Sequence, residues 1–178
     1  MFFVEASHFV MGTFRCCLWC ATRIFVKAAA GRQRLNVRGA WNAVTQELVS
    51  VINTGTVNAD TMCELLRKIA APGLVGPVTL VLDNAKYQHA AAVKALAKEL
   101  GIHLEFLPGY SPNLNLIERL WKFLKRRALY GRYHPDFASF RSAMETEIEQ
   151  LSTIHKSAIA SLMTLNFQTF KNVSLLAA

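Results

Sequence analysis

Residues 78–127 read VTLVLDNAKYQHAAAVKALAKELGIHLEFLPGYSPNLNLIERLWKFLKRR, and this stretch decides the fold. It opens with an apolar, β-branched run that ends abruptly at Asp83, where the packing of a buried strand requires no charge. An amphipathic helix pattern follows, then a short strand pattern over 102–107, a loop with two prolines, and a helix that carries Glu118. Because ligands bind beyond the carboxyl ends of parallel strands, we expect Asp83 and Glu118 to converge on one site.

The length and composition favour a single folded domain over residues 1–178. The 178 residues are 52% hydrophobic, which suits an ordinary core and argues against disorder. No apolar run reaches the roughly 20 residues that span a bilayer. The amino terminus, MFFVEASHF, also lacks the features of a signal peptide. We therefore expect a cytoplasmic protein with no membrane partner.

The cysteines do not indicate a metal site. Cys17 and Cys20 have the CxxC spacing, but no second CxxC or histidine pair accompanies them. We interpret the cysteines as small, reduced core residues.

The net charge of +8 points to a polyanionic partner, of which nucleic acid is the commonest. One basic group lies beside Glu118 and consists of Lys122, Lys125, Arg126, Arg127 and Arg132. A second surrounds an early turn and consists of Lys27, Arg32, Arg34 and Arg38. For the second group a solvated hairpin tip is the favoured interpretation.

The first half of the chain predicts antiparallel strands. Residues 1–10 are apolar on both faces apart from Glu5, a carboxylate that is costly there unless it is paired or bound to metal. Further strands are predicted at 18–28 and 34–43, which would form a meander with the first, and 46–52 could extend it.

The second half predicts alternating helices and strands. A helix capped by Asn58 or Asp60 runs to about Ala71. The predicted elements that follow are strand 78–83, helix 89–100, strand 102–107 and helices 116–128, 137–151 and 156–165. The strand, helix, strand unit implies a parallel pair. Together these elements resemble an α/β, RNase H-like fold with a mixed five-stranded sheet, three strands antiparallel and then two parallel; a flavodoxin-like fold is the alternative.

Three acids on three different elements suit phosphodiester chemistry. Two divalent ions about 3.5 to 4 Å apart can activate the attacking oxygen and stabilise the leaving one. Mg²⁺ prefers oxygen ligands and keeps several waters, so a few carboxylates are enough to hold such a pair. Glu118 lies 35 positions after Asp83 (118 − 83), a moderately specific spacing.

Two segments of the sequence are more specific. VLDNAKYQHA and LPGYSPNLNLIERLWKFLK resemble the DDE-type transposases of the mariner-like superfamily, in particular bacterial insertion-sequence transposases of the six-thirty type, with 34 residues between the two acids as in that family. MFFVEASHF and GRQRLNVRGAWN look like that family's opening and third strands, so the resemblance covers nearly the whole chain.

The resemblance implies a function and a site. It implies a DNA endonuclease that acts in DNA recombination and transposition, cleaving strands with water and joining them through a DNA 3′-hydroxyl. Glu5, Asp83 and Glu118 match the three catalytic, metal-binding acids, with two Mg²⁺ or Mn²⁺ ions and no small-molecule cofactor. The partners implied are transposon ends and target DNA, with a homodimer assembled on them.

The chain departs from that family in two ways. Glu5 stands where aspartate is usual, and its extra methylene shifts the carboxylate by about 1 Å, a misplacement that costs on the order of a hundredfold in rate. The family's helix-turn-helix modules are absent upstream, which suggests a catalytic-domain product, the second of two reading frames, or a decayed copy. The alternatives are therefore an impaired remnant that only binds DNA or a partner subunit, and a structure-specific nuclease.

Several polar residues are weaker candidates for DNA contacts. They are Asn84, Tyr110, Ser111, Asn115, Lys122, Lys125 and Arg126, of which the three basic residues are preferred for phosphate. Asn84 could equally be a turn residue, and residues 110–115 could simply cap the following helix. We expect His89 to face solvent and Trp121 to lie in the core.

Overall fold

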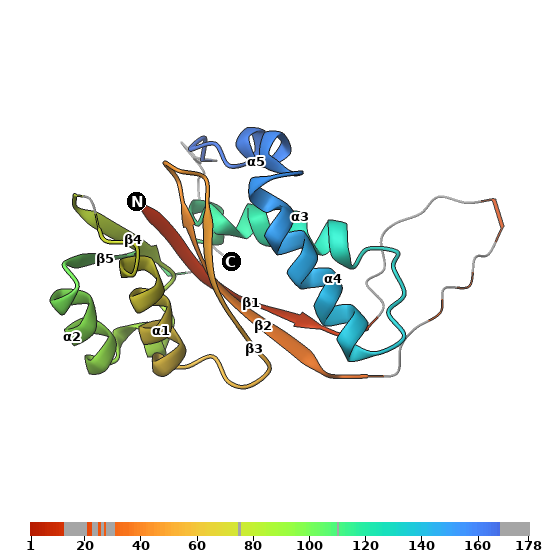
Figure 1. The fold of residues 1–178 in the computed structure, drawn as a ribbon, viewed down its shortest axis with the longest axis horizontal. Coiled ribbons are helices and arrows are strands. Elements are labelled where there is room, and N and C mark those ends of the chain that lie inside the picture. Colours follow the sequence, from red (N-terminus) through yellow and green to blue (C-terminus); the bar gives the residue numbers. More distant parts are fainter. Residues whose placement is uncertain are drawn as a thin grey trace, which may run out of the picture.

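The computed structural model describes residues 1–12, 21–22, 25, 27, 31–74, 76–109 and 111–167. Within them the chain forms a five-stranded sheet in the order β3-β2-β1-β4-β5, with helices on both faces (Figure 1). The strands are β1 (Phe2–Val10), β2 (Arg34–Asn42), β3 (Leu48–Asn53), β4 (Val78–Leu82) and β5 (Ile102–Phe106). The first three are antiparallel, whereas β4 is parallel to both β1 and β5. The mixed sheet predicted from the sequence is confirmed.

The antiparallel part of the described sheet consists of β1, β2 and β3. β1 pairs directly with β2, from Phe2 opposite Asn42 to Val10 opposite Arg34, and has β4 on its other side. β2 pairs in turn with β3, so β3, which was predicted as a possible extension, is the third antiparallel strand among the described residues. Residues 18–28 lie largely outside the described part of the chain.

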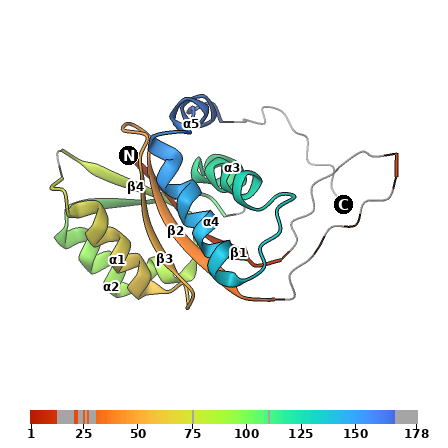
Figure 2. The same cartoon turned by 45° about the vertical axis from the view of Figure 1, so that its right-hand side comes forward.

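The helices divide between the two faces of the sheet (Figures 1 and 2). One face carries α1 (Ala59–Ala70), the 3-10 turn η1 (Lys86–His89) and α2 (Ala91–Glu99). The other carries α3 (Ile117–Ala128), α4 (Phe137–Glu149) and α5 (Lys156–Leu162), with the turns η2 (Pro112–Leu114) and η3 (Gln150–Ser152). These bounds lie close to the predicted ones, except that η1 separates β4 from α2 and α5 ends earlier.

Local signals explain two of the helix ends. The Asn58 side chain accepts the Thr61 N–H at 3.1 Å, and Thr61 Oγ1 in turn accepts the Asn58 N–H, so Asn58 rather than Asp60 caps α1. Beyond α2, Gly101 has a φ of 67°, a left-handed conformation that glycine adopts without strain.

Alternation along β1 sends its residues into two separate cores. Phe3 and Phe9 pack with Trp121 beneath α3 and α4, whereas Phe2 and Val4 pack beneath α1 and α2. Glu5 shares the parity of Phe3 and Phe9 and therefore lies on the α3 face of the sheet.

The structure also bears on the expectations that the chain does not cross a membrane and that its cysteines are reduced core residues. No helix among the described residues is long and apolar enough to cross a membrane. Cys63 is buried on α1 with a free thiol. Cys16, Cys17 and Cys20 lie outside the described ranges.

Candidate active site

Two of the three predicted acids line one cavity. Val4 of β1 is paired with Leu82 of β4, so the next residue on each strand, Glu5 and Asp83, lie beside each other. A cavity of about 170 Å³ is lined by Glu5, Asp83, Leu107, Pro108, Ser111, Pro112 and Asn115. Glu118 belongs to the first turn of α3, which covers this face, and its carboxylate is close enough to Glu5 to perturb its ionisation.

Glu5 is electrostatically disfavoured as an anion. Burial raises the pKa of Glu5 to about 9, and the negative charges of Glu118 and Asp83 add to the rise. The Trp121 indole N–H opposes the rise in pKa, although its nitrogen does not reach hydrogen-bond geometry. Glu5 Oε2 is buried without a hydrogen-bond partner.

The side-chain oxygens at this site are of the kind that binds divalent cations, but they are not arranged closely enough to coordinate one without side-chain movement. Among the described residues, no three His, Cys, Asp or Glu side chains converge tightly enough to hold a metal ion. Yet the cavity brings together carboxylates that repel one another and an oxygen with no partner, and Mg²⁺ and Mn²⁺ bind such hard oxygens. Glu5, Asp83 and Glu118 are the groups that would hold the ion, after side-chain adjustment.

Asp83 is oriented by a residue that the sequence analysis missed. Gln88 of η1 donates from Nε2 to Asp83 Oδ1 at 2.5 Å. Gln88 is only 1% exposed, so it has few alternative positions. A glutamine five residues after the acid gives no distinctive signal in sequence.

Asn84 joins the ends of β4 and β5. Its Nδ2 donates to the Leu107 carbonyl, and its Oδ1 lies 3.2 Å from Nε2 of His89. The His89 ring stacks on Phe106 at 4.1 Å between centroids while remaining exposed, as expected. Both ends of the Asn84 amide thus have contacts within the protein.

The loop before α3 presents its candidate residues differently. Ser111 lines the cavity and is partly exposed, whereas Asn115 is 3% exposed and donates from Nδ2 to the Val4 carbonyl at 3.2 Å. Tyr110 lies outside the described residues.

Some basic side chains of α3 contact other groups of the protein, whereas others are exposed to solvent. Lys122 and Arg126 are exposed, while Lys125 places Nζ 5.6 Å from the centre of the Phe9 ring. Arg127 Nε lies 3.3 Å from Glu147 Oε2, an oxygen that also lies 2.8 Å from His155 Nε2. The face of α3 that is available to an external phosphate is therefore centred on Lys122 and Arg126.

Arg119, next to Glu118, fastens the segment after α5 to α3. Its guanidinium donates to the carbonyl oxygens of Leu162, Thr164 and Asn166 at 3.2, 2.8 and 2.6 Å. Residue 167 adds a ring contact, with the centroids of Phe167 and Phe3 5.9 Å apart.

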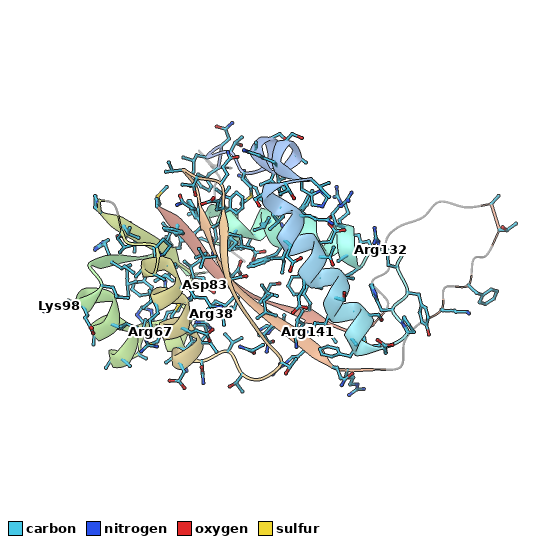
Figure 3. The ribbon with its side chains drawn as sticks, in the orientation of Figure 1. Arg38, Arg67, Asp83, Lys98, Arg132 and Arg141 are labelled. Carbon is cyan, nitrogen blue, oxygen red and sulfur yellow. The ribbon has the colours of Figure 1, made fainter. Side chains whose placement is uncertain are left out.

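The assignment of Arg38 to a solvated hairpin tip is wrong. Arg38 lies inside β2 opposite Ala6 and is 2% exposed, with none of its guanidinium nitrogens hydrogen bonded. Its Cζ lies 4.3 Å above the centre of the Tyr87 ring, and Figure 3 labels it near Asp83. Burial lowers the pKa of Arg38, whereas Tyr87 and Asp83 oppose that change. A charge inside an apolar strand was the available signal, as for Glu5.

Gly39 allows α3 to approach the site. It lies opposite Glu5 on β2, and a Cβ there would meet Trp121 Cη2 at 2.7 Å and Leu48 Cδ1 at 2.9 Å. Trp121 is 1% exposed, which confirms its predicted core position.

Solved structures with similar folds are transposases and an integrase. A Mos1 transposase paired-end complex with the left transposon end matches with a TM-score of 0.59 at 16% identity, over 90% of this chain and 54% of that one. The Mos1 catalytic domain with raltegravir and Mg gives 0.57 at 14% identity, over 93% and 85%. The BIV integrase catalytic core gives 0.50 at 20% identity, over 68% and 76%.

The likenesses establish an RNase H-like fold, as predicted. The chain spans 54% of the length of the Mos1 chain in the paired-end complex. Comparison with curated proteins gives no significant match.

A family model described as DDE superfamily endonuclease matches residues 21–141. The match includes Asp83 and Glu118 and begins after Glu5, so the assignment of Glu5 rests on its place beside Asp83 in the cavity. Because the model covers more than half of the chain, the chain belongs to the DDE superfamily endonucleases.

Proposed function

We propose that residues 1–178 are the catalytic domain of a DDE transposase of the six-thirty insertion-sequence type. In this proposal the domain cleaves DNA strands with water and transfers them through a DNA 3′-hydroxyl, acting in the cytoplasm. Recognition of transposon ends would come from helix-turn-helix modules outside residues 1–178.

One observation carries the proposal. Glu5 and Asp83, on adjoining strands, line one cavity, and Glu118 of α3 is close enough to raise the pKa of Glu5. Asp83 directly follows β4, and the crevice beyond the carboxyl ends of parallel strands is the position at which sheets of this kind bind ligands. Mutual repulsion of this kind is unfavourable for a fold and is offset by bound cations.

The residues of the chain would divide the work as follows. Glu5, Asp83 and Glu118 would hold two Mg²⁺ or Mn²⁺ ions, which supply activation of the attacking oxygen and stabilisation of the leaving oxygen. Gln88 would hold one Asp83 oxygen by its hydrogen bond and leave the other for the ion. Trp121 shields Glu5 from solvent.

DNA would approach across the exposed part of α3. Lys122 and Arg126 would contact phosphates, with Lys125 at the edge of the same face and Ser111 at the mouth of the cavity. Asn84 and Tyr110 remain candidates for backbone contacts at the ends of β4 and β5. The full assembly would be a homodimer on two transposon ends.

A nicking assay tests the proposal. Supercoiled plasmid is incubated with the chain in Mg²⁺, Mn²⁺ or EDTA, and the open-circular product is measured for the wild type, Asp83→Asn, Glu118→Gln and Glu105→Gln. We expect metal-dependent nicking that falls at least a hundredfold in the first two variants. Glu105, an exposed carboxylate on β5, is the control and leaves the rate unchanged. Metal-independent nicking, or full activity in Asp83→Asn, would refute the assignment.

The identity of Glu5 supports a second candidate, a remnant that binds DNA without cleaving it. Its carboxylate is longer than aspartate, and the acids do not close around an ion as they stand. If the wild type does not nick DNA and Glu5→Asp does, the wild-type chain is an impaired remnant. Active protein that never joins a 3′-hydroxyl end to target DNA would instead be a simple nuclease.

A further inference from the structure

Asn115 is a buried polar residue at the candidate site whose carbonyl oxygen has no partner. It connects η2 to α3, is 3% exposed, and lines the same cavity as Glu5 and Asp83. Its Oδ1 is buried and accepts no hydrogen bond. A buried acceptor left unpaired costs on the order of 1 to 3 kcal/mol, so a group this well enclosed calls for an explanation.

The orientation of the Asn115 amide is fixed by its neighbour. Nδ2 donates to the backbone carbonyl of Val4 at 3.2 Å, and a carbonyl oxygen can only accept. Rotating the amide by 180° would place two acceptors against each other. The Oδ1 atom is therefore held away from β1 by a bond made one residue before Glu5.

Three of the residues that line the cavity, Glu5, Asp83 and Asn115, carry side-chain oxygen acceptors, beside the apolar Leu107, Pro108 and Pro112. Glu5 Oε2 is also buried and unpaired, and Asp83 accepts from Gln88 with one oxygen only. An unpaired amide oxygen beside two carboxylates is a ligand set for a hard divalent cation, and a cavity of about 170 Å³ leaves space for its waters. Burial also argues against the contact with DNA backbone that the sequence suggested for Asn115.

We propose that Asn115 supplies a neutral oxygen ligand, through Oδ1, to the divalent cation bound by Glu5 and Asp83. The inference rests on the proposed function, since it assigns a fourth residue to the same site. A neutral ligand completes the coordination of the ion without adding to the repulsion between the carboxylates.

Mn²⁺ binding to the full chain tests this role, with the loss of the free-ion electron paramagnetic resonance signal as the readout. We expect Asn115→Ala to bind Mn²⁺ about tenfold more weakly than the wild type, the size of effect seen when groups that support a metal are removed. Asn115→Asp keeps an oxygen in place and is expected to bind at least as tightly as the wild type. Asn36→Ala is the control, because Asn36 is equally buried and hydrogen bonded but lies on β2, away from the cavity.

Thermal unfolding separates coordination from structure. Both Asn115 variants lose the bond to Val4 and should unfold earlier without metal, yet Mn²⁺ should raise the melting temperature of Asn115→Asp and have little effect on Asn115→Ala. Equal Mn²⁺ affinity in the wild type and Asn115→Ala would overturn the inference alone. A wild type that binds no Mn²⁺ would overturn the proposed metal chemistry as well. If Asn115→Ala does not fold, an Asn115→Asp protein that binds Mn²⁺ more weakly than the wild type overturns the inference.

Discussion

Glu5 is a buried acid whose ionisation bears on the stability of the metal-free fold. Its pKa lies near 9, above the value of 4.5 for a free side chain, because burial and two neighbouring acids disfavour the anion. The folded state therefore holds a proton on Glu5 that the unfolded state releases between these two values. Stability from this source is fully present below pH 4.5 and is lost as the pH rises toward 9.

Glu5→Gln is therefore expected to flatten the pH dependence of stability. In EDTA, the free energy of unfolding of the wild type should fall between pH 5 and pH 9, whereas that of Glu5→Gln should stay nearly level. At pH 8 the variant should be more stable by about 1 to 2 kcal/mol. Urea titrations at several pH values measure this, with Glu64→Gln on the exposed side of α1 as control. Equal slopes for the wild type and Glu5→Gln would contradict the burial of a protonated Glu5.

Residues of the candidate site differ in how visible they are in sequence. Asp83 and Glu5 could be picked out because a charge that interrupts an apolar strand is conspicuous. Gln88 could not, because an amide is unremarkable until its partner, Asp83, is known. Asn115 was picked out as a candidate for DNA contact, because its burial and its bond to Val4 are visible only in the structure. Arg38 had the same signal as Glu5, but its nearness to a turn in sequence favoured the wrong interpretation.

At the scale of elements, the contact between β2 and α3 sets the depth of the site. Trp121 lies flat enough against Gly39 that no side chain fits between them, and the same helix carries Glu118 one turn earlier. A methyl group at position 39 would push Trp121, and α3 with it, away from Glu5.

Gly39→Ala is expected to lower the free energy of unfolding by about 1 to 3 kcal/mol, because the core is overpacked at this point. Denaturant titration measures the loss. Gly55→Ala serves as control, since a Cβ there meets no atom within 4 Å. Combining Gly39→Ala with Trp121→Phe should recover part of the loss, and a strictly additive double variant would show that the two residues do not press on each other.

The ends of helices could be predicted from the sequence where a residue at the end itself determines the structure there. Asn58 and Gly101 mark helix ends through hydrogen bonding and backbone conformation, which act over a few residues. Strand partners are different, because pairing of β1 with β2 joins residues more than twenty positions apart and leaves no local trace. The strand predicted at 18–28 lies largely outside the described residues and stays a prediction.

The molecule combines a net charge of +8 with exposed cations on both faces of the described sheet. Lys122 and Arg126 are exposed on α3, on the face of the sheet that carries the acids, whereas Arg67 is exposed on α1 behind it (Figure 3). Binding of DNA through phosphates should depend on the first pair and not on Arg67.

Replacing Lys122 and Arg126 with Gln should weaken binding to a mixed-sequence duplex and make it less sensitive to salt. Removing one cation that neutralises a phosphate reduces the slope of log K against log salt by about 1. Fluorescence anisotropy over a range of NaCl concentrations measures the slope, with Arg67→Gln as control. An unchanged slope in the double variant would place the DNA elsewhere on the surface.

The clamp formed by Arg119 has a mechanical consequence. One guanidinium holds the carbonyl oxygen of Leu162 at the end of α5 and those of Thr164 and Asn166 beyond it, and it adjoins Glu118 in the chain, so displacement of residues 162–166 would pull on the helix that bears an acid. Trimming the chain after Leu162 would remove two of those acceptors and leave a guanidinium with unmet donors one residue from Glu118.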